Sequence, residues 1–186
     1  MTDNTAQIAS LNHLLSAGTI ILLVIGLIWL VAIIANWKKG EGAKFLPRVA
    51  NYVFPIGFIT SLAGLVGSLY YSEVLGILPC DLCWFQRVFL YPQAFMFAYA
   101  WYKKDSSVLA YSIILSTLGL LIGAYQHVMQ LGYSVYRPCS TAPFAVDCST
   151  PTFIEYGFVT FPLMAVVLFA ILILIAVTHK RFAKRQ

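Results

Sequence analysis

Charge is scarce in this sequence of 186 residues. Only 10% of the residues are Asp, Glu, Lys or Arg, against roughly 25% in soluble domains, whereas hydrophobic residues reach 60%. The mean hydropathy is +0.82. This composition excludes a disordered chain, and the net charge of +5 comes from a few clustered basic residues rather than from the basic face of a nucleic-acid-binding protein. The net positive charge therefore reflects the topology of a membrane protein.

Long uncharged runs separate the few charges and predict membrane-spanning helices. Most runs reach the ~20 residues that an α-helix needs to cross a hydrocarbon core of ~30 Å. Helices are favoured over barrel strands because the runs are continuous, and because a helix in lipid satisfies its own backbone hydrogen bonds. We predict an all-α integral membrane protein with five transmembrane helices, at about 14–37, 51–71, 84–102, 108–128 and 158–178.

The positions of the basic residues predict the orientation of these helices. Ten of the twelve lie in the segments 38–48, 103–104 and 180–185, and only Arg87 and Arg137 lie toward the other side. By the positive-inside rule, the N-terminus and the loops around 72–83 and 129–157 face outward, and the C-terminus is cytoplasmic. We interpret the first run as a retained helix rather than a secretory signal, because basic residues follow it and none precedes it.

All four cysteines lie in segments predicted to face outward. Cys80 and Cys83 form a C-x-x-C motif at the start of the third predicted helix, and Cys139 and Cys148 share the last outward loop. Disulfides persist outside the cytosol, so two disulfides are the expected default. Cys139 and Cys148 are then either a structural bridge or a redox pair. The spacing of Cys80 and Cys83 favours redox exchange, because so small a loop constrains the unfolded chain little.

Two features of the third predicted helix favour a reactive thiolate at Cys83. The N-terminus of the helix presents unpaired N–H groups and the positive end of its dipole. Arg87 follows Cys83 by four residues and therefore lies on the same helix face. Such surroundings stabilise a thiolate, which is the form that attacks a disulfide. Arg87 either stabilises negative charge on Cys83 or on a bound acceptor, or extends to the lipid head groups.

His127 is a further polar residue at the outward end of the fourth predicted helix. It is either an interfacial hydrogen-bonding residue or part of an acceptor site. Gln126 and Met129 beside it either line a pocket or pack against neighbouring helices.

Several motifs in this chain, taken together, resemble those of the DsbB/BdbC family of disulfide bond formation proteins. In the run from Pro79 to Arg87, the cysteine pair has Leu82 before its second cysteine and an arginine four residues beyond it. The further matches are Tyr125-Gln126-His127, Pro138-Cys139 with Cys148, and Phe161-Pro162. The resemblance covers about residues 51–178.

This resemblance implies a four-helix transmembrane bundle of the DsbB type at residues 49–179. Residues 1–48 are then an extra N-terminal transmembrane helix with a basic cytoplasmic loop, and residues 180–186 are a basic cytoplasmic tail. The implied activity is that of a quinone-dependent protein-disulfide oxidoreductase of the bacterial cytoplasmic membrane. The implied partner is an extracytoplasmic thioredoxin-like thiol oxidase of the DsbA/BdbD type, and the acceptor is a membrane quinone, ubiquinone or menaquinone.

The resemblance also implies a role for each cysteine. Cys139 is expected to form the mixed disulfide with the partner, and Cys148 to resolve it or to relay to Cys80. Cys83 is expected to become the thiolate that faces the quinone. No metal site is expected. The residues expected to bind the acceptor are Cys83, Arg87, His127 and Met129.

Three other classes of protein remain open from the sequence. Four thiolates are able to hold a zinc or copper ion, which defines a metal-binding membrane protein. The disulfides of a structural or transport protein would only brace its outward loops. A membrane reductase similar to vitamin K epoxide reductase would use a related bundle and C-x-x-C motif to run electrons outward.

Overall fold

Helices make up most of the described chain, which confirms the all-α membrane class. The computed structural model describes residues 2–37, 45–133 and 146–183, and no β-strand occurs within these ranges. A single π-helical turn, η1, continues α3 without a break in the chain. The elements are α1 (Thr2–Asn36), α2 (Phe45–Ala50), α3 (Val53–Leu69), η1 (Tyr70–Val74), α4 (Asp81–Lys103), α5 (Val108–Gln130) and α6 (Phe161–Phe182).

Four helical segments within the described ranges are long and apolar enough to cross a membrane. These segments are Ile8–Asn36, Val53–Val74, Val108–Gln130 and Phe161–Phe182. α4 has 23 residues, or about 34 Å of helix, but it falls short in apolarity. It buries Gln86, Arg87 and Gln93, and buried polar side chains are tolerated in a membrane helix where neighbouring helices satisfy them. The crossing of the membrane by α4 therefore stays a prediction.

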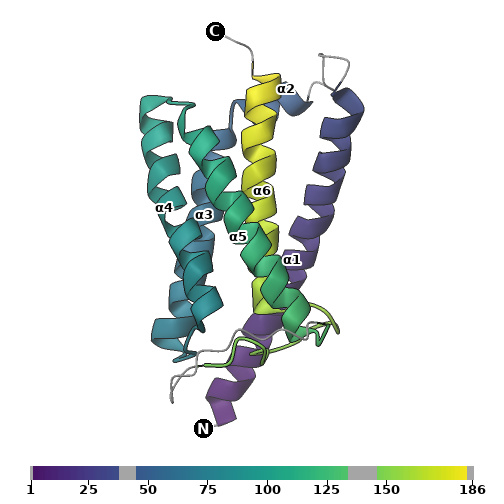
Figure 1. Cartoon of the computed structure of the whole chain (residues 1–186), viewed down its shortest axis with the longest axis vertical. Coiled ribbons are helices and arrows are strands. Elements are labelled where there is room, and N and C mark those ends of the chain that lie inside the picture. The colour runs from purple at the N-terminus through teal and green to yellow at the C-terminus, as the bar shows by residue number, and fades with distance from the viewer. Residues whose placement is uncertain (1, 38–44, 134–145, 184–186) are drawn as a thin grey trace.

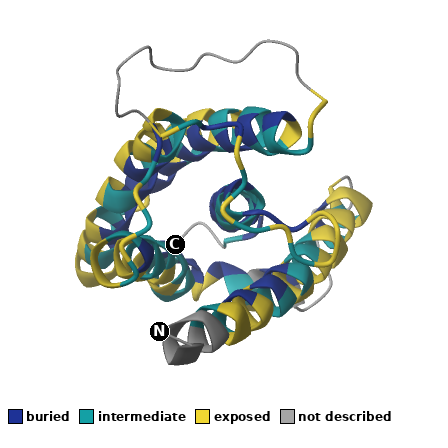
Figure 2. Ribbon diagram, turned by 90° about the horizontal axis from the view of Figure 1, so that it is seen from below, coloured by how far each residue is buried: buried dark blue, intermediate teal, exposed yellow. Residues whose placement is uncertain are grey.

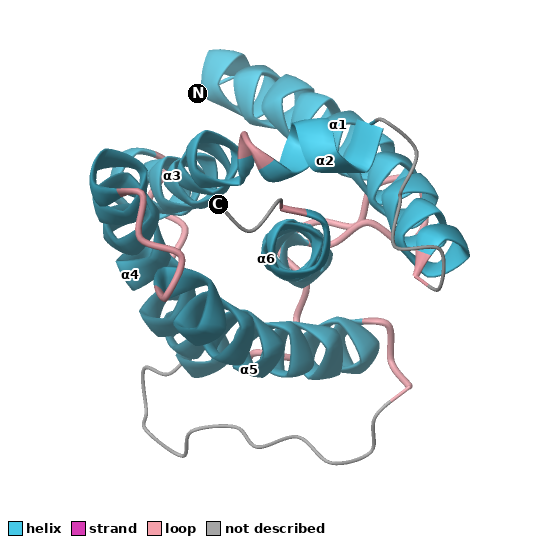
Figure 3. Ribbon diagram, turned by 90° about the horizontal axis from the view of Figure 1, so that it is seen from above, coloured by secondary structure: helices cyan, strands magenta, loops and turns pink. Residues whose placement is uncertain are grey.

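α6 stands at the centre of the bundle, with the other helices around it (Figure 3). It packs against α5, α3, α1 and α2. Its side chains Phe169, Leu172 and Ile175 are fully buried. The exposed residues of the surrounding helices lie mainly on their outer faces, and the buried ones face inward (Figure 2). The core of the protein is thus built around α6.

The two ends of the bundle differ in character. The start of α1 and the segments 75–80 and 146–160 gather at one end, which we call the sulfur end (Figure 1). The opposite end, which we call the basic end, holds α2, residues 104–107 and the end of α6. The described basic residues of that end are Arg48, Lys103, Lys104, Lys180 and Arg181. Among the described residues, the segments predicted to face outward therefore lie at the sulfur end, and those predicted to be cytoplasmic lie at the basic end.

The structure differs from the predicted spans chiefly at their boundaries. α1 begins at Thr2, well before the predicted start at 14, and α4 begins at Asp81. α2 was not predicted. It forms because Leu46 is fully buried, in a cluster with Ile33 and Phe182. An uncharged run marks the part of a helix that suits lipid, whereas packing outside that run decides where the helix ends.

Two glycines let bulky rings bring the helices together. A Cβ atom on Gly57 would lie 2.5 Å from the ring of Phe97, and one on Gly119 would overlap the ring of Phe169. Both rings are fully buried. Small residues that allow such close approach are common in membrane helix interfaces. These contacts fix α3 against α4 and α5 against α6, which positions the sulfur end.

Candidate active site

The C-x-x-C motif lies where the chain enters α4. Cys80 is the N-cap residue, with extended backbone angles, and Cys83 lies in the first helical turn. Their Sγ atoms are 3.4 Å apart, and both residues are free thiols in the structure. Because α4 begins at Asp81, both sulfurs lie at the positive end of the helix dipole. For Cys83, this placement favours the thiolate form that the sequence predicts.

Cys148 joins this motif from the segment that precedes α6. Cys80, Met129 and Cys148 form one buried cluster, with the side chain of Cys83 packed against it. Cys148 is only 4% exposed. Its backbone carbonyl accepts a hydrogen bond of 3.2 Å from Gln130 Nε2, which ties the segment to α5. Three of the four predicted catalytic cysteines are therefore brought together, and Cys139 lies outside the described residues.

The two sulfurs of the C-x-x-C motif differ in how readily they ionise. The pKa of the Cys80 thiol is raised, first because its Sγ donates a hydrogen bond to Cys83 and then because it is buried. The side chain of Cys148 acts on Cys80 in the same direction. Cys80 therefore keeps its proton, and Cys83 is the member of the pair that ionises first.

A buried glutamine on α5 contacts both sulfurs of the motif. Gln126 Nε2 donates to Cys80 Sγ at 3.2 Å and to Cys83 Sγ at 3.3 Å. The orientation of this amide is set by Gln86 Nε2, which donates to Gln126 Oε1 at 2.6 Å. Gln126 is fully buried, so water does not compete for these contacts. The arrangement holds an N–H donor against the sulfurs, where it stabilises negative charge.

Arg87 is buried at the junction of α4 with α3. Its Nε donates to Ser68 Oγ at 2.9 Å and its Nη2 to the Ser68 carbonyl at 3.0 Å. The guanidinium also lies 5.1 Å from the ring centre of Trp84. Among the residues that the structure describes, no acidic side chain forms an ion pair with Arg87. Its charge is therefore available to a thiolate or to a bound anion.

A cavity of about 300 Å³ opens beside Cys83. Its polar groups include Cys83, Gln86 and Arg87, and most of its other lining is apolar. A mainly apolar cavity of this size with a few convergent polar groups is typical of a small-molecule site. The apolar lining comes from α1, α3, α4 and α6 and includes Leu15, Ala63, Leu90, Ala165, Val167 and Leu168.

His127 and Met129 are not among the residues that line this cavity. His127 Nδ1 lies 2.8 Å from Thr160 Oγ1, a contact that joins α5 to the start of α6. Met129 is buried against Cys80 and Cys148. The structure thus brings Cys83 and Arg87 to the cavity, whereas His127 and Met129 contact other parts of the sulfur end.

Two residues that shape this site are not among the predicted site residues. Gln86, which follows Cys83 by three residues, shares its helix face, and this spacing is a signal that identifies it as a neighbour. Ser68 comes from α3, and no local pattern connects it to Arg87. Within the described ranges, no group of three or more His, Cys, Asp or Glu side chains is arranged to hold a metal ion.

The fold and the site define an all-α membrane protein with a buried cluster of redox-capable cysteines at one end of its bundle. The chain belongs to the DsbB family, because the sequence model of the disulfide bond formation protein DsbB matches residues 50–179. The protein is therefore a disulfide-forming oxidoreductase and a multi-pass bacterial membrane protein. The family match begins after α1.

Relatives of this chain carry names from the same family. The SPbeta prophage-derived disulfide bond formation protein B of Bacillus subtilis is 36% identical over 126 residues, which are 67% of this chain and 83% of the relative. A probable disulfide formation protein of Oceanobacillus iheyensis is 33% identical over 69% of this chain and 89% of its own length. Disulfide bond formation protein C of Bacillus subtilis is 31% identical over 63% of this chain and 84% of its own length. No solved structure matches the chain significantly.

Proposed function

We propose that this protein reoxidises an extracytoplasmic thioredoxin-like thiol oxidase of the DsbA/BdbD type and passes the electrons to membrane quinone. The observation that carries this proposal is the position of Cys83. Its side chain packs against the cluster that contains Cys148, and it also lines the cavity beside Arg87. In this proposal, Cys83 connects two sites. One is the segment of Cys148, which the soluble partner protein would contact, and the other is the cavity, which would bind an apolar acceptor. In this proposal the sulfur end faces outward and the C-terminus is cytoplasmic.

The first step exchanges disulfides with the partner protein. A thiolate of the reduced partner attacks the Cys139–Cys148 disulfide, forms a mixed disulfide with Cys139 and releases Cys148 as a thiolate. The second thiol of the partner then attacks the partner sulfur that is bonded to Cys139, and Cys139 leaves as a thiolate. The partner leaves as a disulfide, and Cys139 and Cys148 hold its two electrons.

The second step moves these electrons to the C-x-x-C motif. The Cys148 thiolate attacks Cys80 in the Cys80–Cys83 disulfide, and Cys83 leaves as a thiolate. Cys139 then attacks Cys148 in the new Cys148–Cys80 bond, which restores the Cys139–Cys148 disulfide and releases Cys80. The burial of Cys148 against Cys80 supports this route, and the Gln126 amide and the helix dipole favour Cys83 as the leaving thiolate.

The cavity fits a quinone, because it combines an apolar lining with hydrogen-bonding groups close to a sulfur. A bound quinone supplies an acceptor for two electrons and two protons. Cys83, Gln86 and Arg87 would hold it, and the charge of Arg87 would stabilise negative charge on Cys83 or on an oxygen atom in the cavity. The apolar residues of α3 and α6 would exclude water from this region.

Reconstitution of the full chain in lipid tests this function. With reduced thioredoxin-like partner and quinone, we expect partner oxidation that depends on quinone, measured as partner disulfide and quinol formed in equal amounts. We expect Cys→Ser changes at Cys80, Cys83, Cys139 and Cys148 each to abolish turnover, because each removes a sulfur that the exchange requires. The matched control is Ser149→Ala, which changes the neighbour of Cys148 without removing a sulfur.

Three results would contradict the proposal. Normal turnover of all four serine variants would remove the cysteines from the reaction. Stoichiometric zinc without quinone-dependent thiol oxidation would indicate a metal-binding protein. Reduction of the partner by quinol under the same conditions would indicate a reductase that runs electrons outward.

A further inference from the structure

α1 lies outside the family match at 50–179, yet it lines the cavity beside Cys83. The spacing of its lining residues follows one face of an α-helix. α1 packs mainly on α6, and this face borders the cavity together with residues of α3, α4 and α6. The lining residues of α1 are Leu14, Leu15, Gly18, Thr19 and Leu22.

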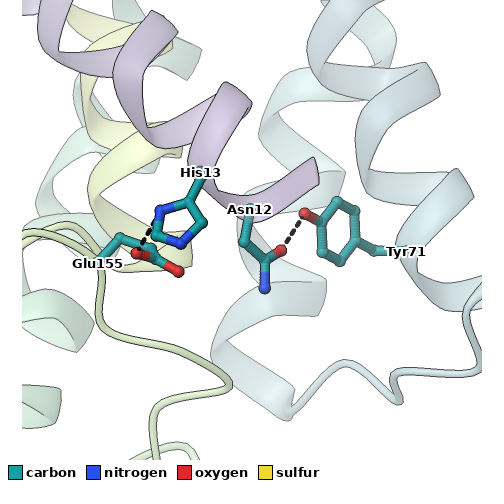
Figure 4. A network of polar contacts seen from close by, with 4 residues as sticks. All are labelled: Asn12, His13, Tyr71 and Glu155. Carbon is teal, nitrogen blue, oxygen red and sulfur yellow. Dashed lines mark hydrogen bonds and ion pairs between the residues drawn. The ribbon is translucent and has the colours of Figure 1, made fainter. Parts of the chain in front are cut away.

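Polar contacts at the sulfur end hold α1 in this position (Figure 4). The hydroxyl of Tyr71, in η1, donates to Asn12 Oδ1. The next residue, His13, has its Nδ1 atom 2.9 Å from Glu155 Oε2, in the segment that also carries Cys148. Asn12 and Tyr71 are both buried. Two consecutive residues of α1 are therefore tied to η1 and to the segment that carries Cys148.

A further contact holds α1 farther along the bundle. Trp29 Nε1 donates to Thr178 Oγ1 on α6 at 3.1 Å. α1 is thus attached both near the cysteines and toward the basic end, and the part between these attachments borders the cavity. α1 therefore forms a fixed wall on one side of the cavity.

Gly18 is the point on this wall where the cavity has spare room. A Cβ atom built on Gly18 meets no other atom within 4 Å. Across the cavity, a Cβ atom on Gly64 of α3 would lie 2.7 Å from Leu90 and 2.9 Å from Leu168. The α3 side is therefore already packed at Gly64, whereas the α1 side leaves space at Gly18.

We propose that α1 forms a wall of the quinone cavity and that Gly18 leaves the room in which the ring or chain of the acceptor lies. This inference rests on the proposed function and adds a determinant of acceptor binding from outside the matched core. The residues of α1 that border the cavity are apolar apart from Thr19, whose hydroxyl donates to the Leu15 carbonyl of its own helix. This wall therefore suits a lipid-soluble acceptor.

Filling the space at Gly18 tests the proposal. We expect Gly18→Leu to raise the KM for quinone about 10-fold, because overpacking removes the room that the acceptor needs. The KM for the reduced partner is expected to stay unchanged. Binding is measured separately, as quinone retained per protein after purification and as equilibrium dialysis of a short-chain quinone. Gly18→Ala is expected to give a smaller loss of the same kind.

Gly26→Leu is the matched control, because Gly26 lies on the same helix, does not line the cavity, and its Cβ would meet only Leu174 Cδ1 at 3.9 Å. We expect wild-type quinone binding in this variant. If the wild type transfers electrons to quinone while Gly18→Leu and Gly18→Ala bind quinone normally, the role of α1 is wrong and the proposed function stands. If the wild type shows no quinone-dependent oxidation, the proposed function itself fails.

Discussion

Gln126 connects the chemistry of the two C-x-x-C sulfurs to the packing of α4 against α5. Its Nε2 atom reaches both sulfurs, and its Oε1 atom is held by Gln86. An amide that is fixed in this way needs no reorganisation when negative charge forms on a sulfur. Gln126 is thus a positioning residue that acts through Cys83.

We expect Gln126→Leu to slow alkylation of Cys83 several-fold at neutral pH, because it removes a hydrogen bond to the thiolate, and a hydrogen bond to a charged group contributes about 1.5–3 kcal/mol. Mass spectrometry of the peptide that carries Cys83, after timed exposure to iodoacetamide, measures this rate. Gln93→Leu is the matched control, since Gln93 is equally buried but binds Ser112 and Ser116. Equal alkylation rates in the wild type and Gln126→Leu would remove Gln126 from this role.

The sequence predicts some of these residue positions and not others. The four-residue spacing of Cys83 and Arg87 correctly puts them on one face, and both line the cavity. His127, which is also predicted to bind the acceptor, does not line this cavity, and its ring contacts Thr160. Neighbours on an α-helix point about 100° apart, so Gln126 and His127 do not both face the sulfurs. The packing of α5 against its neighbours decides whether Gln126 or His127 faces the sulfurs, and the local sequence does not encode this packing.

At the scale of elements, uncharged runs predict where the helices lie but not how they end. Each of the five predicted runs corresponds to a helix. The turn of π-helix at Tyr70–Val74 was not predicted, because an extra residue per turn leaves no mark in the hydropathy pattern. This turn places Tyr71 against Asn12 and against the ring of Phe161, whose centre is 4.8 Å away.

Close helix contacts at glycine give a prediction at the same scale. We expect Gly119→Ala to lower the free energy of unfolding by about 1–3 kcal/mol, because the new methyl group would overlap the buried ring of Phe169. Unfolding in detergent micelles, followed by circular dichroism, measures this change. Gly67→Ala is the control, since its Cβ would meet no atom within 4 Å. A Gly119→Ala protein as stable as the control would show that the α5 and α6 contact tolerates a larger residue.

At the scale of the whole molecule, the bundle separates its basic residues from its cysteines. The described basic residues other than Arg87 lie at the basic end, and the described cysteines lie at the sulfur end (Figure 1). Such a division is what the positive-inside rule requires of a protein with one fixed orientation.

Labelling in intact cells tests the orientation. In a variant with all four cysteines changed to serine, we expect Thr150→Cys to react with a membrane-impermeant maleimide and Ser106→Cys to react only after lysis. Both residues are exposed, so accessibility within the protein does not limit either reaction. Ser106 lies between α4 and α5 at the basic end, whereas Thr150 follows Cys148. If only Ser106→Cys reacted in intact cells, the protein would have the opposite orientation to the one proposed.

The cavity and the cysteine cluster share one half of the bundle, and this has an energetic consequence for a living cell. In the proposed scheme, electrons and their protons enter and leave near the same surface and travel laterally. Moving one elementary charge through the full thickness of a membrane at 100 mV involves about 2.3 kcal/mol of electrical work. A lateral path avoids that work, so the membrane potential would not act directly on this electron transfer.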